Sequence, residues 1–324
     1  MKRMLAVWVV VAVAAGPIAR AVQTQLQGPA GSGAFGSRVL TLTNGNIVVG
    51  DPYYSVPGGP TNAGAAYLYN GKTLERISML TGSQANDYVG YRLTALSNGH
   101  YVVQSVNWHN GSAANAGAAT WCSGTGGLNG VVSPANSLVG SAAGSYVGYR
   151  VVALVNGHYV VRSPNWVNGG AANAGAATWG DGTRGITGVV SAANSLVGSA
   201  AGSYVGGGVT ALANGHYVVR SANWVNGAAA NAGAATWGDG TRGITGAVSA
   251  ANSLVGSAAE SYVGYSVTEL ANGNYVVRSA NWVNGAAADA GAATWGDGTS
   301  GAAGAVSAAN SLVGSAAGSF VGYG

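Results

Sequence analysis

The feature that most limits the possible folds of this chain is an internal repeat with a spacing of 58 residues. A Val-Gly dipeptide, a tryptophan and an Asn-Gly pair all recur at this spacing. Their first residues are Val89, Val147, Val205, Val263 and Val321; Trp121, Trp179, Trp237 and Trp295; and Asn98, Asn156, Asn214 and Asn272. Repeats of this length are typical of arrays in which each unit buries its apolar face against its neighbour.

We divide the chain accordingly into a leading strand segment, five units and the start of a sixth. These are residues 22–34, then 35–88, 89–146, 147–204, 205–262 and 263–320, then 321–324. The first unit is diverged and has 54 residues. We expect either a ring of five units with one spare strand or, as we prefer, a piece of a longer array.

Residues 1–21 have the pattern of a secretory signal peptide. A positive start at residues 2–3 precedes an apolar run at 5–15 and an Ala-Arg-Ala cleavage site at 19–21. The run is too short to span a bilayer, which needs about 20 apolar residues. We therefore expect a secreted or cell-surface protein that begins at Val22 and does not span the membrane; an uncleaved anchor or a buried helix is the alternative.

Composition favours a folded, nearly neutral protein. High glycine content, 56 residues, and only 7% charged residues could indicate disorder, but a hydrophobic fraction of 48% supplies a core. Three of the 13 basic residues lie in the expected leader, which leaves 10 against 9 acidic residues. We expect no nucleic-acid partner, because no basic cluster stands out in the sequence. Cys122 is alone and cannot form an intramolecular disulfide.

The unit at 147–204 contains several strand patterns. Residues 150–154 and 158–163 flank Asn156-Gly157, which predicts a hairpin with a type I′ turn. Residues 174–179 predict a third strand, and 188–196 a fourth. The fold class expected is all-β, a β-propeller-like array of four-stranded antiparallel blades. A β-solenoid is the alternative, although its coils of about 20 residues would need a threefold sub-period that the units lack.

The first unit resembles the FG-GAP repeat. The segments that carry the resemblance are Phe35-Gly36, 47–52, 63–69, 80–84 and 88–90. The resemblance implies blades like those of the integrin alpha-chain propeller and of bacterial surface proteins. The later units match more loosely and also resemble repeats of unknown function in large bacterial exported proteins.

Calcium sites are not carried over from that resemblance. The corresponding turns read Leu-Thr-Asn-Gly-Asn, Leu-Ser-Asn-Gly-His and Leu-Val-Asn-Gly-His, and they contain no carboxylate ligand. We therefore predict no metal and no cofactor.

Catalysis is not expected. Histidines follow the Asn-Gly pair in three units, and aspartates occupy Gly-Asp-Gly turns in three: His100, His158 and His216, and Asp181, Asp239 and Asp297. Turn geometry explains both sets. An active site needs several different groups that converge once, whereas these recur in equivalent places.

Binding is better supported than catalysis. An Asn-Trp pair begins the longest loop of each later unit, and these pairs are the candidate ligand-binding residues: Asn107, Trp108, Asn165, Trp166, Asn223, Trp224, Asn281 and Trp282. Packing of these rings between units is the competing interpretation. Trp179 and its equivalents lie in a strand and are expected in the core. Arg162, Arg220 and Arg278 are expected on a solvated face or a blade edge.

The function expected is an exported bacterial surface or extracellular binding or adhesion module that presents repeated loops. Its ligand would be a protein or glycan at a cell surface. The alternative is a structural array or spacer of a larger surface protein, with no specific ligand.

Overall fold

Strands and turns make up the part of the chain that the structure describes. This computed structural model describes residues 7–11 and 22–323, and within them there is no helix. Most strands belong to five sheets, one for each unit, so the all-β prediction is confirmed. None of the described residues forms a helix that could cross a membrane. β1 (Val7–Val11) and β2 (Val22–Leu26) pair as a separate antiparallel hairpin; the remainder of the expected signal peptide lies outside the described residues.

The first four sheets have the same strand order, and the fifth repeats its first four strands. The first contains β3 (Arg38–Thr41), β4 (Ile47–Asp51), β5 (Ala65–Tyr69), β6 (Arg76–Thr81) and β10 (Gly130–Val131). The second contains β7 (Arg92–Ala95), β8 (Tyr101–Ser105), β9 (Ala118–Cys122), β11 (Leu138–Val139) and β15 (Gly188–Val189). The third contains β12 (Arg150–Ala153), β13 (Tyr159–Ser163), β14 (Ala176–Gly180), β16 (Leu196–Val197) and β20 (Gly246–Ala247). The fourth contains β17 (Gly208–Ala211), β18 (Tyr217–Ser221), β19 (Ala234–Gly238), β21 (Leu254–Val255) and β25 (Gly304–Ala305). The fifth contains β22 (Ser266–Glu269), β23 (Tyr275–Ser279), β24 (Ala292–Gly296) and β26 (Leu312–Val313).

The predicted hairpin at Asn156-Gly157 is confirmed, but its turn type is not. β12 and β13 are antiparallel neighbours, and the Gly157 amide donates to the Leu154 carbonyl at 3.2 Å. Gly157 has a φ of 90°, whereas Asn156 keeps a negative φ. A type I′ turn needs positive φ at both positions, so this turn is of another type.

The expected fourth strand is in fact two short strands in different sheets. β15 adds in parallel to β11 of the preceding unit, whereas β16 pairs antiparallel with β14 of its own unit. A turn separates them, in which Asn194 Oδ1 accepts the Ser191 amide at 2.9 Å. Each sheet from the first to the fourth is therefore completed by a strand from the next unit, and adjacent units are joined through their backbones.

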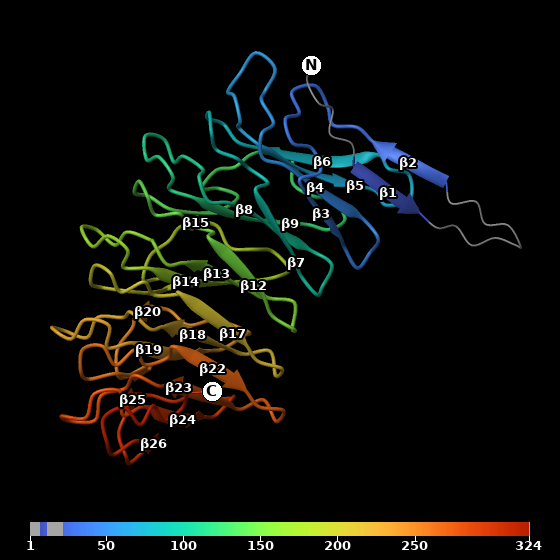
Figure 1. Cartoon of the computed structure of the whole chain (residues 1–324). Coiled ribbons are helices and arrows are strands. Elements are labelled where there is room, and N and C mark those ends of the chain that lie inside the picture. The colour runs from blue at the N-terminus through green and yellow to red at the C-terminus, as the bar shows by residue number, and fades with distance from the viewer. Residues whose placement is uncertain (1–6, 12–21, 324) are drawn as a thin grey trace, which may run out of the picture.

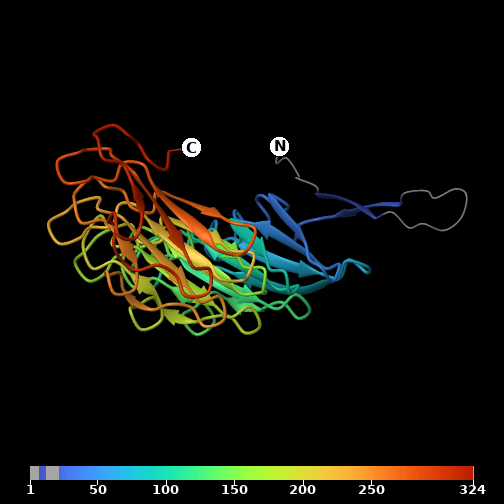
Figure 2. The same cartoon turned by 90° about the horizontal axis from the view of Figure 1, so that it is seen from below.

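The five sheets stack face to face along the chain (Figure 1). The strands β3, β7, β12, β17 and β22 lie beside one another in sequence order and form what we call the inner edge. The first and fifth sheets lie at opposite ends of the stack, and the β1–β2 hairpin projects from the body (Figure 2). Apolar clusters fill the spaces between sheets, and each combines residues of two units.

The two ends of the stack differ. The free face of the first sheet is covered by an aromatic cluster that contains Phe35 and Tyr67. Among the described residues, the fifth sheet has four strands, without the parallel strand that the next unit supplies to the other four. Leu312 is consequently 71% exposed, although its equivalents Leu138 and Leu196 are fully buried.

Candidate functional site

The tryptophans of the Asn-Trp pairs are buried, as the competing interpretation of packing between units expects. Trp108, Trp166, Trp224 and Trp282 are between 3 and 6% exposed. Trp166, for example, packs with Val147 and Val161 against the preceding sheet. Each loop folds back because the Trp166 amide donates to the Ser163 carbonyl and its carbonyl accepts the Gly175 amide, both at 3.0 Å.

The asparagines of these pairs hold the loop together. The side-chain amides of Asn107, Asn165 and Asn223 each donate to the Oδ1 atom of an asparagine eight residues later at 3.1 Å. Asn281 donates to Asp289 in the same way at 2.9 Å. The accepting residues have φ values of 52–54°, a conformation that asparagine and aspartate tolerate well. This geometry leaves the Oδ1 atoms of the pair asparagines available as acceptors.

The strand tryptophans lie at the boundary between units rather than in the core. Trp121, Trp179 and Trp237 are half-buried, and each indole N–H donates to a turn carbonyl of the next unit at 2.9–3.0 Å. The Asn-Gly asparagine of the same unit donates to the same carbonyl; Asn98 and Trp121 both bind the Gly182 oxygen. Trp295, in the last described unit, makes no such hydrogen bond with the described residues and is 54% exposed.

The histidines and aspartates of the turns form hydrogen bonds with nearby groups of the same unit. His100 Nδ1 accepts the Gly124 amide at 3.0 Å, and Asn274 Oδ1 accepts the equivalent Gly298 amide at 2.9 Å in the last unit. Asp181 accepts the amide and hydroxyl of Thr183. Hydrogen bonds to this side chain, together with Arg184, hold the pKa of Asp181 below its ordinary value despite partial burial. No described group of three or more His, Cys, Asp or Glu side chains could hold a metal ion.

A different set of residues gathers at the inner edge. The first residue of each inner strand and its partner in the next strand include at least one arginine in all five sheets. We call this set the arginine row: Arg38, Arg92, Arg150, Arg162, Arg220 and Arg278. Within the described residues, the only ion pairs of arginine are Arg184–Asp181 and Arg242–Asp239, so the row has no acidic partner.

The row is continuous in space around the third sheet. Arg162 Nε donates to the Gly206 carbonyl at 3.0 Å, and Arg220 donates to the Tyr265 carbonyl at 2.9 Å. Burial and the positive charge of Arg220 both lower the pKa of Arg162. This part of the row therefore bridges units and carries uncompensated positive charge.

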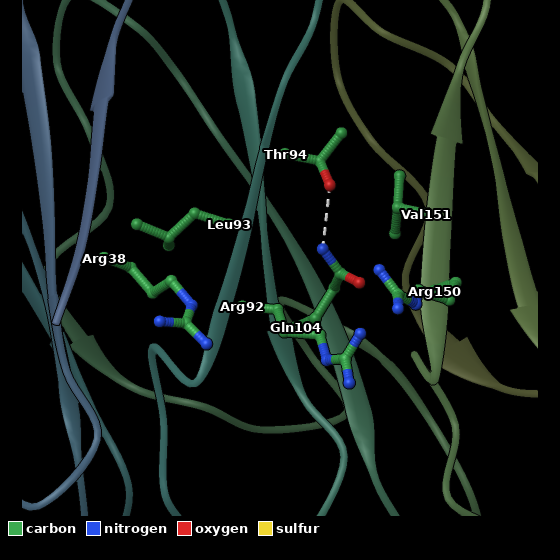
Figure 3. Close-up of a pocket in the computed structure, with 7 residues that line it drawn as sticks. All are labelled: Arg38, Arg92, Leu93, Thr94, Gln104, Arg150 and Val151. Carbon is green, nitrogen blue, oxygen red and sulfur yellow. Dashed lines mark hydrogen bonds between the residues drawn. The ribbon is translucent and has the colours of Figure 1, made fainter.

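Three members of the row line an open pocket of about 360 Å³, which we call the arginine pocket. Arg38, Arg92 and Arg150 come from β3, β7 and β12, the inner strands of three successive sheets (Figure 3). Guanidinium groups stay charged over the accessible pH range and match carboxylate, sulfate and phosphate geometry. An anionic group would therefore be favoured in this pocket.

Gln104 also lines the arginine pocket. Its side chain is 2% exposed, and its amide nitrogen donates to Thr94 Oγ1 at 2.8 Å. Its buried Oε1 atom has no hydrogen-bond partner, and in Figure 3 this oxygen points away from Thr94, on the side of Arg150. A buried acceptor without a donor costs about 1–3 kcal/mol, which a ligand hydroxyl or amide could recover.

A second open pocket of about 340 Å³ adjoins the first; we call it the tyrosine pocket. It is lined by Tyr91, Tyr146, Tyr149 and by the candidate residues Asn107 and Asn165. Arg92 connects the two pockets, because its guanidinium carbon lies 5.7 Å from the Tyr91 ring centre and 5.9 Å from that of Tyr149.

The sequence contained an unused signal for the arginine pocket. When the units are aligned, arginine fills one position in the first three, Arg38, Arg92 and Arg150, and Gly208 and Ser266 replace it in the last two. Gln104 likewise departs from the arginine found at its position in the next three units. These differences between units indicate a site confined to the first three sheets.

A family model described as "Repeat of unknown function (DUF5650)" matches the chain five times, at residues 41–91, 95–149, 153–207, 211–265 and 269–323. These segments cover most of the sequence. The chain belongs to this family. Each DUF5650 match starts at or beside the end of an inner strand and closes just after the next Val-Gly pair. No curated protein matches the chain.

Proposed function

We propose that this DUF5650 chain is an exported, non-enzymatic binding module that captures an anionic ligand at its inner edge. The observation that carries the proposal is the arginine pocket, which Arg38, Arg92 and Arg150 line with no acidic partner among the described residues. Export is supported by the expected leader at residues 1–21, and an adhesive role at a cell surface would follow from it.

The scaffold for this function is best described as propeller-like. Each sheet begins with three antiparallel strands in sequence order, and the inner strands of successive sheets are neighbours. A solenoid of parallel coils is less compatible with these hairpins, whereas the resemblance to FG-GAP repeats favours blades. Such a scaffold brings residues 54 to 58 positions apart into one row.

A structural array without a ligand is the second candidate. Arg162 and Arg220 donate to backbone carbonyls of the next unit, so part of the row has a bridging role. Charged side chains on edge strands also discourage pairing with other chains. For Arg38, Arg92 and Arg150, edge protection alone would predict aggregation when the charges are removed, with no change in ligand affinity.

The test compares Arg38→Gln/Arg150→Gln with Arg184→Gln/Arg242→Gln, which removes the same charge at a remote site. Both pairs are exposed, so both variants should fold. The probe is dextran sulfate, with uncharged dextran beside it, measured by calorimetry at low and moderate salt. We expect the pocket variant to bind dextran sulfate about ten-fold more weakly or worse, and the remote variant to stay within about two-fold of the parent.

Two results would count against the proposal. Equal loss in both variants would show that net charge alone attracts the polymer. Failure of the parent to bind dextran sulfate, with aggregation of the pocket variant, would favour edge protection in a structural array.

A further inference from the structure

The two adjoining pockets differ in the chemistry that each can recognise. The arginine pocket offers guanidinium donors and one orphaned acceptor, Gln104 Oε1. The tyrosine pocket offers aromatic rings and the Oδ1 acceptors of Asn107 and Asn165, whose amide nitrogens each donate one hydrogen bond within their loop. A ligand that satisfies both must carry acid groups, hydroxyl donors and apolar faces.

We infer that the arginine pocket and the tyrosine pocket together bind neighbouring residues of an acidic oligosaccharide. This inference rests on the proposed function and adds the ligand class to it. A carboxylate or sulfate of one sugar would lie among Arg38, Arg92 and Arg150. A hydroxyl would donate to Gln104 Oε1, and the next sugar ring would pack on Tyr149.

The position of Arg92 joins the two halves of the site. Its guanidinium group lines the arginine pocket and also lies near the rings of Tyr91 and Tyr149. Such cation–π contacts contribute about 0.5–1 kcal/mol at exposed sites and hold the arginine in a fixed orientation. An acid group bound to Arg92 therefore places the adjacent part of the ligand against the tyrosines.

Acceptors distinguish a sugar from a nucleic acid here. Phosphate groups of a nucleic-acid backbone carry no donors at neutral pH, so they would leave Gln104 Oε1 unpaired and face the Asn107 and Asn165 oxygens unfavourably. Sugar hydroxyls donate to such acceptors and stay close to the acid groups of the same ring. In single-stranded DNA the donors lie on the bases, across the deoxyribose from the phosphate, so an acidic glycan fits the closely placed arginines and Gln104 Oε1 better.

The repeat provides a matched control position. Tyr265 occupies the place of Tyr149 in the fifth unit, where it is 67% exposed and lines neither pocket. At the corresponding place the fourth unit has Gly207. If the tyrosines contribute to binding, substitutions of Tyr91 and Tyr149 should lower the affinity for the ligand, and substitution of Tyr265 should not change it.

The experiment measures affinities of the full chain for oligogalacturonate, its methyl-esterified form, polyphosphate and a single-stranded DNA oligonucleotide of similar length. We expect oligogalacturonate to bind most tightly and the neutral ester to bind least. Tyr149→Ala should weaken oligogalacturonate binding about ten-fold, while polyphosphate binding stays within about two-fold and Tyr265→Ala changes neither. Gln104→Met keeps the buried volume but removes the acceptor. This variant should therefore also weaken the binding of oligogalacturonate more than the binding of polyphosphate.

The outcomes separate this inference from the proposed function. If polyphosphate binds as tightly as oligogalacturonate and Tyr149→Ala leaves the ratio unchanged, the pockets capture anions without selecting sugars. If the DNA oligonucleotide binds more tightly than oligogalacturonate, and this binding depends on the tyrosines, the ligand is a nucleic acid and not a glycan. If no anionic probe binds, dextran sulfate included, both the inference and the proposed function are wrong.

Discussion

At the scale of single residues, the tryptophans show where sequence reasoning succeeded and where it failed. Their recurrence correctly indicated equivalent roles, but the roles were exchanged: the loop rings are buried and the strand rings lie half-exposed between units. The place of Trp166 at the start of a long loop suggested a ligand-binding residue, with packing as the alternative. The sequence does not reveal that hydrogen bonds from its backbone to Ser163 and Gly175 turn the loop back over the sheet.

Trp166→Ala should therefore destabilise the protein strongly, whereas Trp295→Ala should not. Removal of a buried ring costs about 3–5 kcal/mol, and Trp166 packs within the apolar cluster between the second and third sheets. Trp295 is 54% exposed and lies at the open end of the stack. Urea unfolding curves of both variants check the prediction. Similar destabilisation by the two changes would show that the loop ring is not a core residue.

At the scale of the hairpin, the sequence predicted the strands well and the turn less well. Apolar runs on both sides of Asn156-Gly157 placed β12 and β13 to within a residue at either end. The turn type and the division of residues 188–196 between two sheets were missed. Both depend on partners in other units, such as the β11 backbone that receives β15, and these partners are remote in sequence.

The turn histidine His100 gives the second sheet a pH dependence. His100 Nδ1 accepts the Gly124 amide, which only the unprotonated nitrogen can do. Burial lowers the pKa of His100 below its ordinary value, so the unfolded chain binds a proton more readily than the folded one. This contribution to stability is complete above about pH 6.5 and is lost as the pH falls through the lower pKa of the folded state.

His100→Asn should reduce that pH dependence. Asparagine at this position accepts the same bond in the fifth unit, where Asn274 Oδ1 receives the Gly298 amide at 2.9 Å. We expect the drop in unfolding free energy between pH 7.5 and pH 5.5 to shrink by an amount on the order of 1 kcal/mol, the value of one neutral hydrogen bond. His100→Ala, the control, should be less stable at both pH values. An unchanged slope in His100→Asn would assign the pH dependence to other groups.

At the scale of the whole molecule, the repeat predicted the number of sheets but not how they are connected. Units exchange short strands, and each turn carbonyl such as Gly182 O accepts both Asn98 and Trp121 of the previous unit. The arginine pocket exists only because this stacking brings Arg38, Arg92 and Arg150 together. No single unit contains the site, and therefore no motif within one unit could have predicted it.

The contacts that each unit receives from the next unit, which we call the stacking rule, predict how the fifth sheet would respond to an additional unit. In the first four sheets the next unit supplies a parallel strand and, for the second to fourth, a carbonyl for the strand tryptophan. A copy of residues 267–324 fused after Gly324 should provide both to β26 and Trp295. Because stability in such arrays grows with each added interface, the extended chain should unfold at a higher urea concentration.

Acrylamide quenching of fluorescence tests this directly. In the added copy, the counterpart of Trp295 is replaced by phenylalanine, so that the extension introduces no new exposed strand tryptophan. The quenching due to Trp295 is the difference in quenching between each chain and its Trp295→Phe variant. We expect this difference to be large in the original chain and small in the extended one. Equal quenching in both chains would mean that the added unit folds without docking on the fifth sheet, and the stacking rule would then not hold beyond the units seen here.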